Sequence, residues 1–252
     1  MMKTLRFTLS GKTAFFKKPE VNSYVYFTYG NIHKVALLGI FGAILGYGGY
    51  TQKFGGTKKG KILEESYPEF YERLFSLHVS VVPNAEKGFI RKKIQYFNNS
   101  VGYASGEQGG TLIVKEQWLE EPSWEIYVLL DSEEAERLCK AIQDKKCVYI
   151  PYLGKNDHFA DITGIQVEEA AAAECGTGKI ASLFPKECGT LQVSEDFWDE
   201  EEMTFKYEEK LPVRLDPWTN NYVLQSFIYT DAAVAWEKQK VYCIGNQNIL
   251  FY

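Results

Sequence analysis

Residues 15–50 read FFKKPEVNSYVYFTYGNIHKVALLGIFGAILGYGGY, a basic and aromatic lead-in followed by a short apolar segment rich in glycine. The pattern predicts a helix from Ile32 to about Tyr47 with Asn31 as its N-cap. A glycine inside a helix costs roughly 1 kcal/mol relative to alanine. Something is therefore expected to approach the face that carries these glycines, and two alternatives remain open, a closely packed structural element or a ligand. At 100° per residue, that face carries Gly39, Gly42, Ala43 and Gly46.

This helix is not expected to span a membrane. A span needs about 20 apolar residues, whereas the apolar run here extends only from Val35 to Tyr50 and follows His33 and Lys34. The chain opens with an alternating strand pattern where a signal peptide would have its apolar core. We therefore expect a cytoplasmic protein with no membrane partner.

The composition is that of an ordered globular protein with a substantial core, because 45% of the 252 residues are hydrophobic and 15% are aromatic. The net charge of −5 is distributed unevenly. Residues 1–100 carry 15 Lys and Arg against 6 Asp and Glu, whereas residues 101–252 carry 13 against 27. A basic half favours nucleic-acid binding and an acidic half can face protein neighbours. The alternative is a chance imbalance between solvated faces.

No metal site and no cofactor are expected. The five cysteines are widely spaced without a CxxC pair, and three histidines complete no plausible zinc set. Cys139 and Cys147 are predicted to be small buried residues in a reducing compartment. Residues 55–61 match the GxxxxGK of a P-loop, but Ile62 stands where a Ser or Thr must bind magnesium, so nucleotide hydrolysis is not expected.

The periodicities predict an α+β fold with the βαββαβ order of a ferredoxin-like (RNA-recognition-motif-like) domain. Asp131 and Glu134 form a predicted capping box for the second helix. The expected division is a ferredoxin-like domain over 1–153, with a thumb hairpin inserted at 84–123, and a smaller β-rich C-terminal extension over 154–252. In chain order, the predicted elements are a strand at 4–10, the glycine-rich helix, a short helix at 68–75, a strand at 77–83, the hairpin, a strand at 124–130, a helix at 132–145 and a strand at 147–152.

Three stretches carry a resemblance to a known family: FFKKPEVNSY at 15–24, LLGIFGAILGYGGY at 37–50 and YIPYLGKNDHFADI at 149–162. Together with the N-terminal strand, they resemble the type I-B form of the CRISPR-associated protein five family, a Cascade subunit of the repeat-associated mysterious protein group. The resemblance spans about residues 3–165. Many relatives have a Pro-Ser or Ser-rich turn and a basic residue before the helix, where this chain has GNIHK at 30–34.

The resemblance implies a non-catalytic RNA-binding subunit of an antiviral surveillance complex. Similar proteins cap one end of the Cascade filament, bind the 5′ handle of CRISPR RNA (crRNA) and contact the backbone subunit and the large subunit. Target DNA would be met only indirectly, through the complex. Cations suit phosphates, and aromatic rings suit unstacked bases. The candidate RNA-binding residues are Lys17, Lys18, Asn22, Ser23, Lys34, Arg91, Lys92, Lys93, Tyr96 and Phe97.

Two other functions compete with this one. Members of the type I-C branch cleave precursor crRNA with a tyrosine, lysine and histidine set, and metal-free cleavage needs groups that move protons near neutral pH. Tyr47 or Tyr50 matches the tyrosine, but the inserted hairpin contains no histidine. A scaffold without an RNA role is the other alternative, and it predicts weak, salt-insensitive RNA association.

Overall fold

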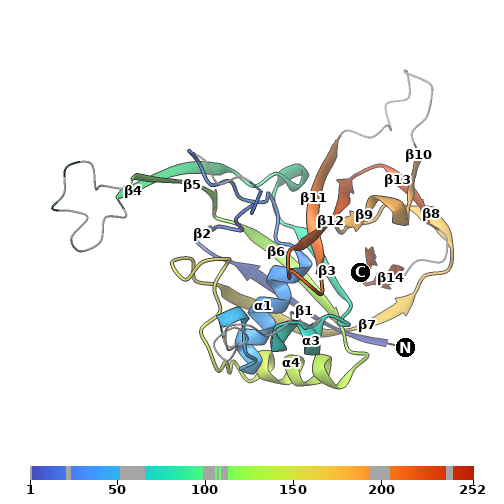
Figure 1. Cartoon of the computed structure of the whole chain (residues 1–252). Helices are drawn as coiled ribbons and strands as arrows, with labels where there is room; N and C mark the ends of the chain where they lie inside the picture. Colours follow the sequence, from blue (N-terminus) through green and yellow to red (C-terminus); the bar gives the residue numbers. More distant parts are fainter. Residues whose placement is uncertain are drawn as a thin grey trace.

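The computed structural model describes residues 2–20, 24–51, 66–98, 106, 108, 113–192, 205–236 and 241–252. Within that part of the chain, one sheet has six strands in the order β15-β14-β7-β1-β6-β3, and all the neighbours pair antiparallel. Helices α1, α3 and α4 lie together, with α1 drawn across the sheet and α4 at the lower edge in Figure 1. The strands are β1 (Met2–Ser10), β3 (Val79–Pro83), β6 (Ser123–Leu129), β7 (Asp161–Ala172), β14 (Val241–Ile244) and β15 (Gln247–Leu250).

The segment β7-β1-β6-β3 is the ferredoxin-like core of the sheet. Numbered by their place in the chain, these strands stand in the order 4-1-3-2, with α1 (Lys34–Leu45) following β1 and α4 (Glu133–Gln143) following β6. The predicted α+β class and βαββαβ order are confirmed. Short α3 (Glu69–Leu74) lies between α1 and β3, as expected.

The fourth strand is not where the sequence pattern put it. Residues 147–152 form no strand, because the chain bends at Val148 and Tyr149. Val148 N donates to Ile44 O and Tyr149 N to Ala43 O, each at 3.0 Å, so this segment pairs with the end of α1. The last turn of a helix leaves carbonyl groups without partners, and this segment satisfies two of them. The strand that pairs with β1 in the position predicted for residues 147–152 is β7. The division at 153/154 stays a prediction, although the sheet takes strands from both sides of it.

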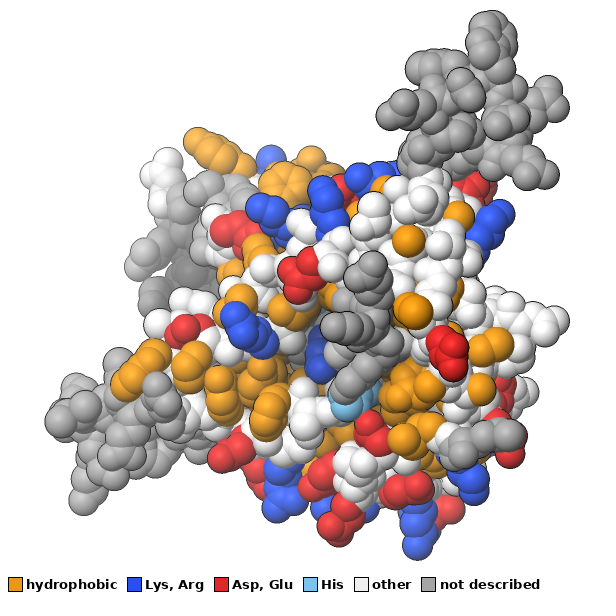
Figure 2. Space-filling view, turned by 90° about the vertical axis from the view of Figure 1, so that its right-hand side faces the viewer, with side chains coloured by type: hydrophobic (Ala, Val, Ile, Leu, Met, Phe, Trp, Pro, Cys, Tyr) orange, Lys and Arg blue, Asp and Glu red, His pale blue; other side chains and the backbone are white. Residues whose placement is uncertain are grey.

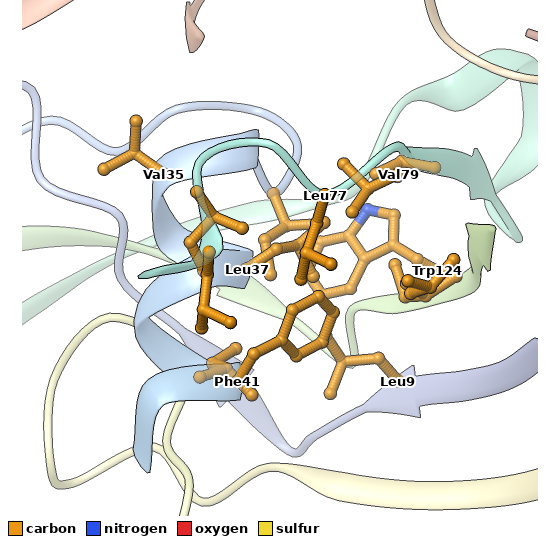
Figure 3. Packing of buried hydrophobic residues seen from close by; sticks show 14 of the residues in the cluster. Leu9, Val35, Leu37, Phe41, Leu77, Val79 and Trp124 are labelled. Atoms are coloured by element: carbon orange, nitrogen blue, oxygen red, sulfur yellow. The ribbon is translucent and has the colours of Figure 1, made fainter. Parts of the chain in front are cut away.

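The core lies between the sheet and α1. Leu5, Phe7 and Leu9 of β1 are fully buried, as their alternation predicts. The Phe7 and Phe41 rings meet edge to face at 6.3 Å. Figure 3 shows Leu37 and Phe41 of α1 packed against side chains of the strands, among them Leu9, Val79 and Trp124.

Both helix N-termini differ from prediction by one or two residues. The N-cap of α1 is His33, whose Nδ1 accepts from Ala36 N at 3.2 Å. Asn31 instead accepts from Trp124 Nε1 at 3.0 Å. The predicted capping box of α4 is also wrong, because Ser132 caps the helix, while Asp131 bonds the His78 ring at 2.6 Å.

The thumb hairpin is present. Strands β4 (Lys92–Asn98) and β5 (Ile113–Glu120) pair antiparallel and project away from the body in Figure 1. Short η1 (Glu86–Gly88) precedes them, and β2 (Thr13–Ala14) joins the base of β5. The lead-in also lies along β5, since Tyr26 N donates to Lys115 O and Gln117 N donates to Tyr26 O, both at 2.9 Å.

The C-terminal part is β-rich, as predicted. A long hairpin of β11 (Lys206–Leu215) and β12 (Tyr222–Thr230) pairs with β9 (Phe184–Pro185). A second small sheet contains β8 (Gly176–Gly178), β13 (Ala233–Trp236) and β10 (Thr190–Gln192), and η3 (Lys186–Cys188) lies between β9 and β10. All five cysteines are free, and Cys139 is buried as predicted. Cys147 is exposed, against prediction, and lies in a run of exposed residues at 143–150.

Candidate nucleic-acid interface

A groove of about 610 Å³ runs beside α1. Its floor is helical and includes Gly39 and Ala43, where the absence of large side chains leaves room. Segments from distant parts of the chain form its walls: residues 15–17 of the lead-in, residues 149–154 and Tyr222 of β12. We call it the α1 groove.

The glycines of α1 are there for different reasons. A Cβ on Gly42 would lie 2.5 Å from Phe70 Cβ, so α3 approaches the helix closely at this point. Gly46 ends the helix in the left-handed region, with φ of 84°, which glycine adopts without strain. A Cβ on Gly39 would meet no atom within 4 Å in the part of the chain that the structure describes. Close packing therefore accounts for Gly42, but not for Gly39.

Lys17 stands at the edge of the α1 groove. Its side chain is exposed, and its Nζ lies 4.0 Å from the centre of the Tyr26 ring. Proteins that bind single-stranded nucleic acids place cations and aromatic side chains next to each other in their binding channels. Lys17 thus sits where the lead-in, the thumb and the groove come together.

A second lysine–aromatic pair lies on one face of the thumb. Lys155 Nζ lies 4.9 Å from the Phe97 ring centre and 3.3 Å from Glu116 Oε1. Glu116 is buried and also accepts from Trp118 Nε1 at 2.8 Å. Tyr26 of the lead-in forms an isolated β-bridge with Glu116. The register of β4 and β5 puts Glu116 and Phe97 on the same face, so Tyr26 and Phe97 share this face of the small sheet, which we call the lysine–aromatic face.

The two predicted stacking residues point to opposite sides of the thumb. Tyr96 and Phe97 are consecutive on β4, so their rings lie on different faces. Tyr96 is 59% exposed and lies with the exposed Ile94 and Ile113. Lys115 Nζ lies 5.3 Å from its ring centre. One strand of RNA lying on the Phe97 face would not reach Tyr96.

Two of the predicted cations turn inward. Lys18 Nζ lies 3.3 Å from Glu209 Oε1 on β11. The same carboxylate accepts from Gly30 N at 2.9 Å, so it ties the lead-in to the C-terminal hairpin. Lys92 lies near both Lys18 and Glu209. Burial lowers the pKa of Lys92, although the negative charge of Glu209 acts in the opposite direction. These lysines contribute to an internal ion cluster.

Arg91 and Lys93 line a different groove, at the base of the thumb, with a volume of about 790 Å³. Three acidic side chains share that lining with three basic ones, and Lys93 Nζ lies 3.5 Å from Glu120 Oε1. A phosphate backbone would meet carboxylates here as well as cations. The charged residues of this groove are Lys12, Arg91, Lys93, Glu86, Glu120 and Glu121.

The remaining predicted residues are dispersed. Lys34 Nζ donates to Tyr252 O at 3.0 Å, at the start of α1. Asn22 and Ser23 lie outside the described residues, as does the P-loop-like stretch 55–61. Of the ten predicted residues, Lys17 lines the α1 groove and Phe97 belongs to one of the two lysine–aromatic pairs.

Sequence reasoning overlooked the bend that follows α4. Tyr149 and Tyr152 line the α1 groove and are 55% and 45% exposed, and Lys155 pairs with Phe97. Residues 149–159, YIPYLGKNDHF, mix aromatic and basic residues just as the lead-in does. The same compositional signal could have identified them.

Of the groups that RNA cleavage would need, Tyr47, His33 and His158 are occupied or buried, whereas Tyr50 lies in the α1 groove and is 38% exposed. Tyr47 donates to Glu134 Oε2 at 2.5 Å and accepts from Arg137 at 2.7 Å. His33 is fully buried, and burial lowers its pKa to about 3. His158 is buried beside Thr13 Oγ1, 2.6 Å from its Nδ1, and burial lowers its pKa as well.

Among the described residues, no group of three or more His, Cys, Asp or Glu side chains is arranged to hold a metal ion. No described helix is both long and apolar enough to cross a membrane. On the face shown in Figure 2, basic and acidic side chains are interspersed with apolar ones, most densely along the lower edge. Side chains of both charges are therefore mixed on that face.

No protein-family model matches the sequence, and no curated protein matches it either. Solved structures do match in fold. A chain of a "CRISPR RNA-guided surveillance complex" aligns over 91% of this chain and 90% of its own length, with a TM-score of 0.51 and 13% identity. A "CRISPR protein from Archaeoglobus fulgidus" aligns over 99% and 98%, with a TM-score of 0.52 and 10% identity. At such identities the similarity concerns the fold, which is the ferredoxin-like fold with additions found in these CRISPR proteins.

Proposed function

We propose that this chain is a non-catalytic RNA-binding subunit of a type I-B Cascade, a member of the CRISPR-associated protein five family that binds and caps the 5′ handle of crRNA. Its partners are then the crRNA handle, the backbone subunit and the large subunit of the complex. The fold similarity to CRISPR proteins supports a role in CRISPR defence. The assignment to this subunit rests on the three sequence stretches quoted above.

The observation that carries the proposal is the meeting of the lead-in and the thumb at two lysine–aromatic pairs. Lys17 with Tyr26 and Lys155 with Phe97 lie on one face, beside a groove with aromatic walls. Single-stranded RNA is bound by cations on phosphates and by rings on unstacked bases. The face offers both kinds of contact without a metal or a cofactor.

The state of the histidines and of Tyr47 supports binding without cleavage. A general base or acid must reach the reacting oxygen, within about 3 Å or through one water. His33 and His158 are buried, and His78 is bonded to Asp131, the residue before the N-cap of α4. Tyr47 is held between Glu134 and Arg137. None of these described groups has free access to a bound strand.

Co-expression with a crRNA and the neighbouring subunits, followed by sequencing of the RNA ends in the purified complex, tests the proposal. We expect an intact 5′ handle to be recovered, and recovery to fall when the handle is scrambled. A complex that assembles equally well on scrambled handles would contradict handle binding. If the purified chain alone generated those 5′ ends from precursor RNA, the endoribonuclease alternative would replace the proposal.

A further inference from the structure

Gly39 has no structural explanation within the described part of the fold. A mid-helix glycine is unfavourable, and here a methyl group would meet no atom of the described residues within 4 Å. By contrast, Gly42 is required by Phe70 and Gly46 by its positive φ. Gly39 lies on the floor of the α1 groove, so its missing side chain serves to deepen that groove.

The walls of the groove present aromatic surface to solvent. Tyr50, Tyr149 and Tyr152 are 38%, 55% and 45% exposed, although large aromatic side chains are usually buried more completely. They come from two segments about 100 residues apart, which the fold brings to the same groove. At about 610 Å³, the groove is within the size range of pockets that bind small organic ligands.

The charge of the groove lining favours a negatively charged occupant. Lys17 is in the lining, and none of the described residues that line the groove is acidic. The charged groove at the base of the thumb is different, because three carboxylates line it. An occupant with a flat apolar part and an adjoining negative charge fits the α1 groove, and a nucleotide of an RNA strand has both.

We infer that the α1 groove receives one unstacked base of the bound RNA, with Lys17 on the adjoining phosphate and Gly39 kept free of a side chain to make room. This inference rests on the proposed function and names the place where a base is held. The groove is continuous with the lysine–aromatic face, since Lys17 belongs to both. A strand lying on that face can therefore insert a base without leaving it.

The test uses the full chain and short single-stranded RNAs that carry 2-aminopurine at one position at a time. The wild type should change the fluorescence of one position strongly. Gly39→Leu should abolish that change and weaken binding by about 5- to 150-fold, the loss of one stacked base. Its melting temperature should stay equal or rise, because the site of the new Cβ is free of other described atoms within 4 Å. Gln143→Leu, on the exposed side of α4, is the matched control and should bind as the wild type does.

An RNA that lacks the base at the identified position should bind equally to the wild type and to Gly39→Leu. If Gly39→Leu binds every RNA as tightly as the wild type, the inference is overturned and the proposed function stands. If Gly39→Leu keeps RNA binding but loses assembly with the neighbouring subunits, the groove holds a protein segment and the inference is wrong. Failure of the wild type to bind any RNA would remove the proposed function itself.

Discussion

Phe70 packs directly on the backbone of Gly42, so closely that a Cβ on Gly42 would lie 2.5 Å from Phe70 Cβ. The Cβ of Phe70 is fixed to its own backbone, so relief requires α1 and α3 to separate. We predict that Gly42→Ala lowers the free energy of unfolding by roughly 1–2 kcal/mol, because the cost of overpacking exceeds the gain in helix propensity. Gly39→Ala should raise it by up to about 1 kcal/mol. Urea denaturation measures both, and an equal effect of the two substitutions would contradict these assignments.

Asn31 joins the lead-in to the sheet. Its buried side chain accepts from Trp124 Nε1 at 3.0 Å and donates to Gly88 O at 3.2 Å. Asn31→Leu should destabilise the chain by about 1–3 kcal/mol, because it leaves a buried donor and acceptor without partners. Asn84→Ala removes exposed hydrogen bonds and should cost less than about 0.5 kcal/mol. Similar losses for the two variants in chemical denaturation would speak against a structural role for the Asn31 network.

Acid should destabilise the chain through His33. Burial lowers the pKa of His33 to about 3 from 6.5, so between those values the unfolded chain binds a proton that the folded chain does not. The contribution of neutral His33 to the free energy of unfolding is therefore fully present above about pH 6.5. It is lost as the pH falls toward 3, at up to about 1.4 kcal/mol per pH unit. His33→Asn keeps a residue that can cap α1 but removes this titration. Its unfolding free energy should fall less steeply with acid, and an unchanged slope would be inconsistent with a buried neutral His33.

Substitutions on the two opposite faces of the thumb should differ in their effect on RNA affinity. Phe97→Ala removes a ring from the face shared with Tyr26 and should weaken RNA binding by about 5- to 150-fold. Tyr96→Ala, its neighbour in sequence, should change RNA affinity by less than about 2-fold, because its ring points the other way. The two variants control for each other. The reverse order of effects would place the RNA on the Tyr96 face.

Periodicity identified the elements whose burial is one-sided. Leu5, Phe7 and Leu9 alternate because β1 has one face on the core, and the pattern predicts the strand. Residues 147–152 and β7 could not be separated in the same way. The first are apolar but pair with α1, whereas β7 is largely exposed and carries little alternation. Hydrogen-bond partners far apart in sequence decided which of them joined the sheet.

The types of residue in the candidate site could be predicted from the sequence, but the particular residues that come together there could not. A mixture of lysines and aromatic residues predicted nucleic-acid binding, and the structure places Lys17 in the lining of the α1 groove and Phe97 beside Lys155. Lys18 and Lys92 lie instead near Glu209, which is more than 100 residues away from either of them in the sequence. The contribution of Tyr149 and Lys155 arises only when the bend after α4 folds against the lead-in and the thumb. Such long-range pairings leave no local pattern.

The decisive measurement is the affinity of the purified full chain for single-stranded RNA as a function of salt concentration. Phosphate contacts predict a linear fall of log affinity with log salt, with a slope of about −0.7 per contact for single strands. Lys17→Ala should make that slope shallower by about one contact, while Lys146→Ala, on an exposed lysine beyond α4, should leave it unchanged. Weak binding that does not respond to salt, in the wild type and both variants alike, would contradict RNA binding and favour the scaffold alternative.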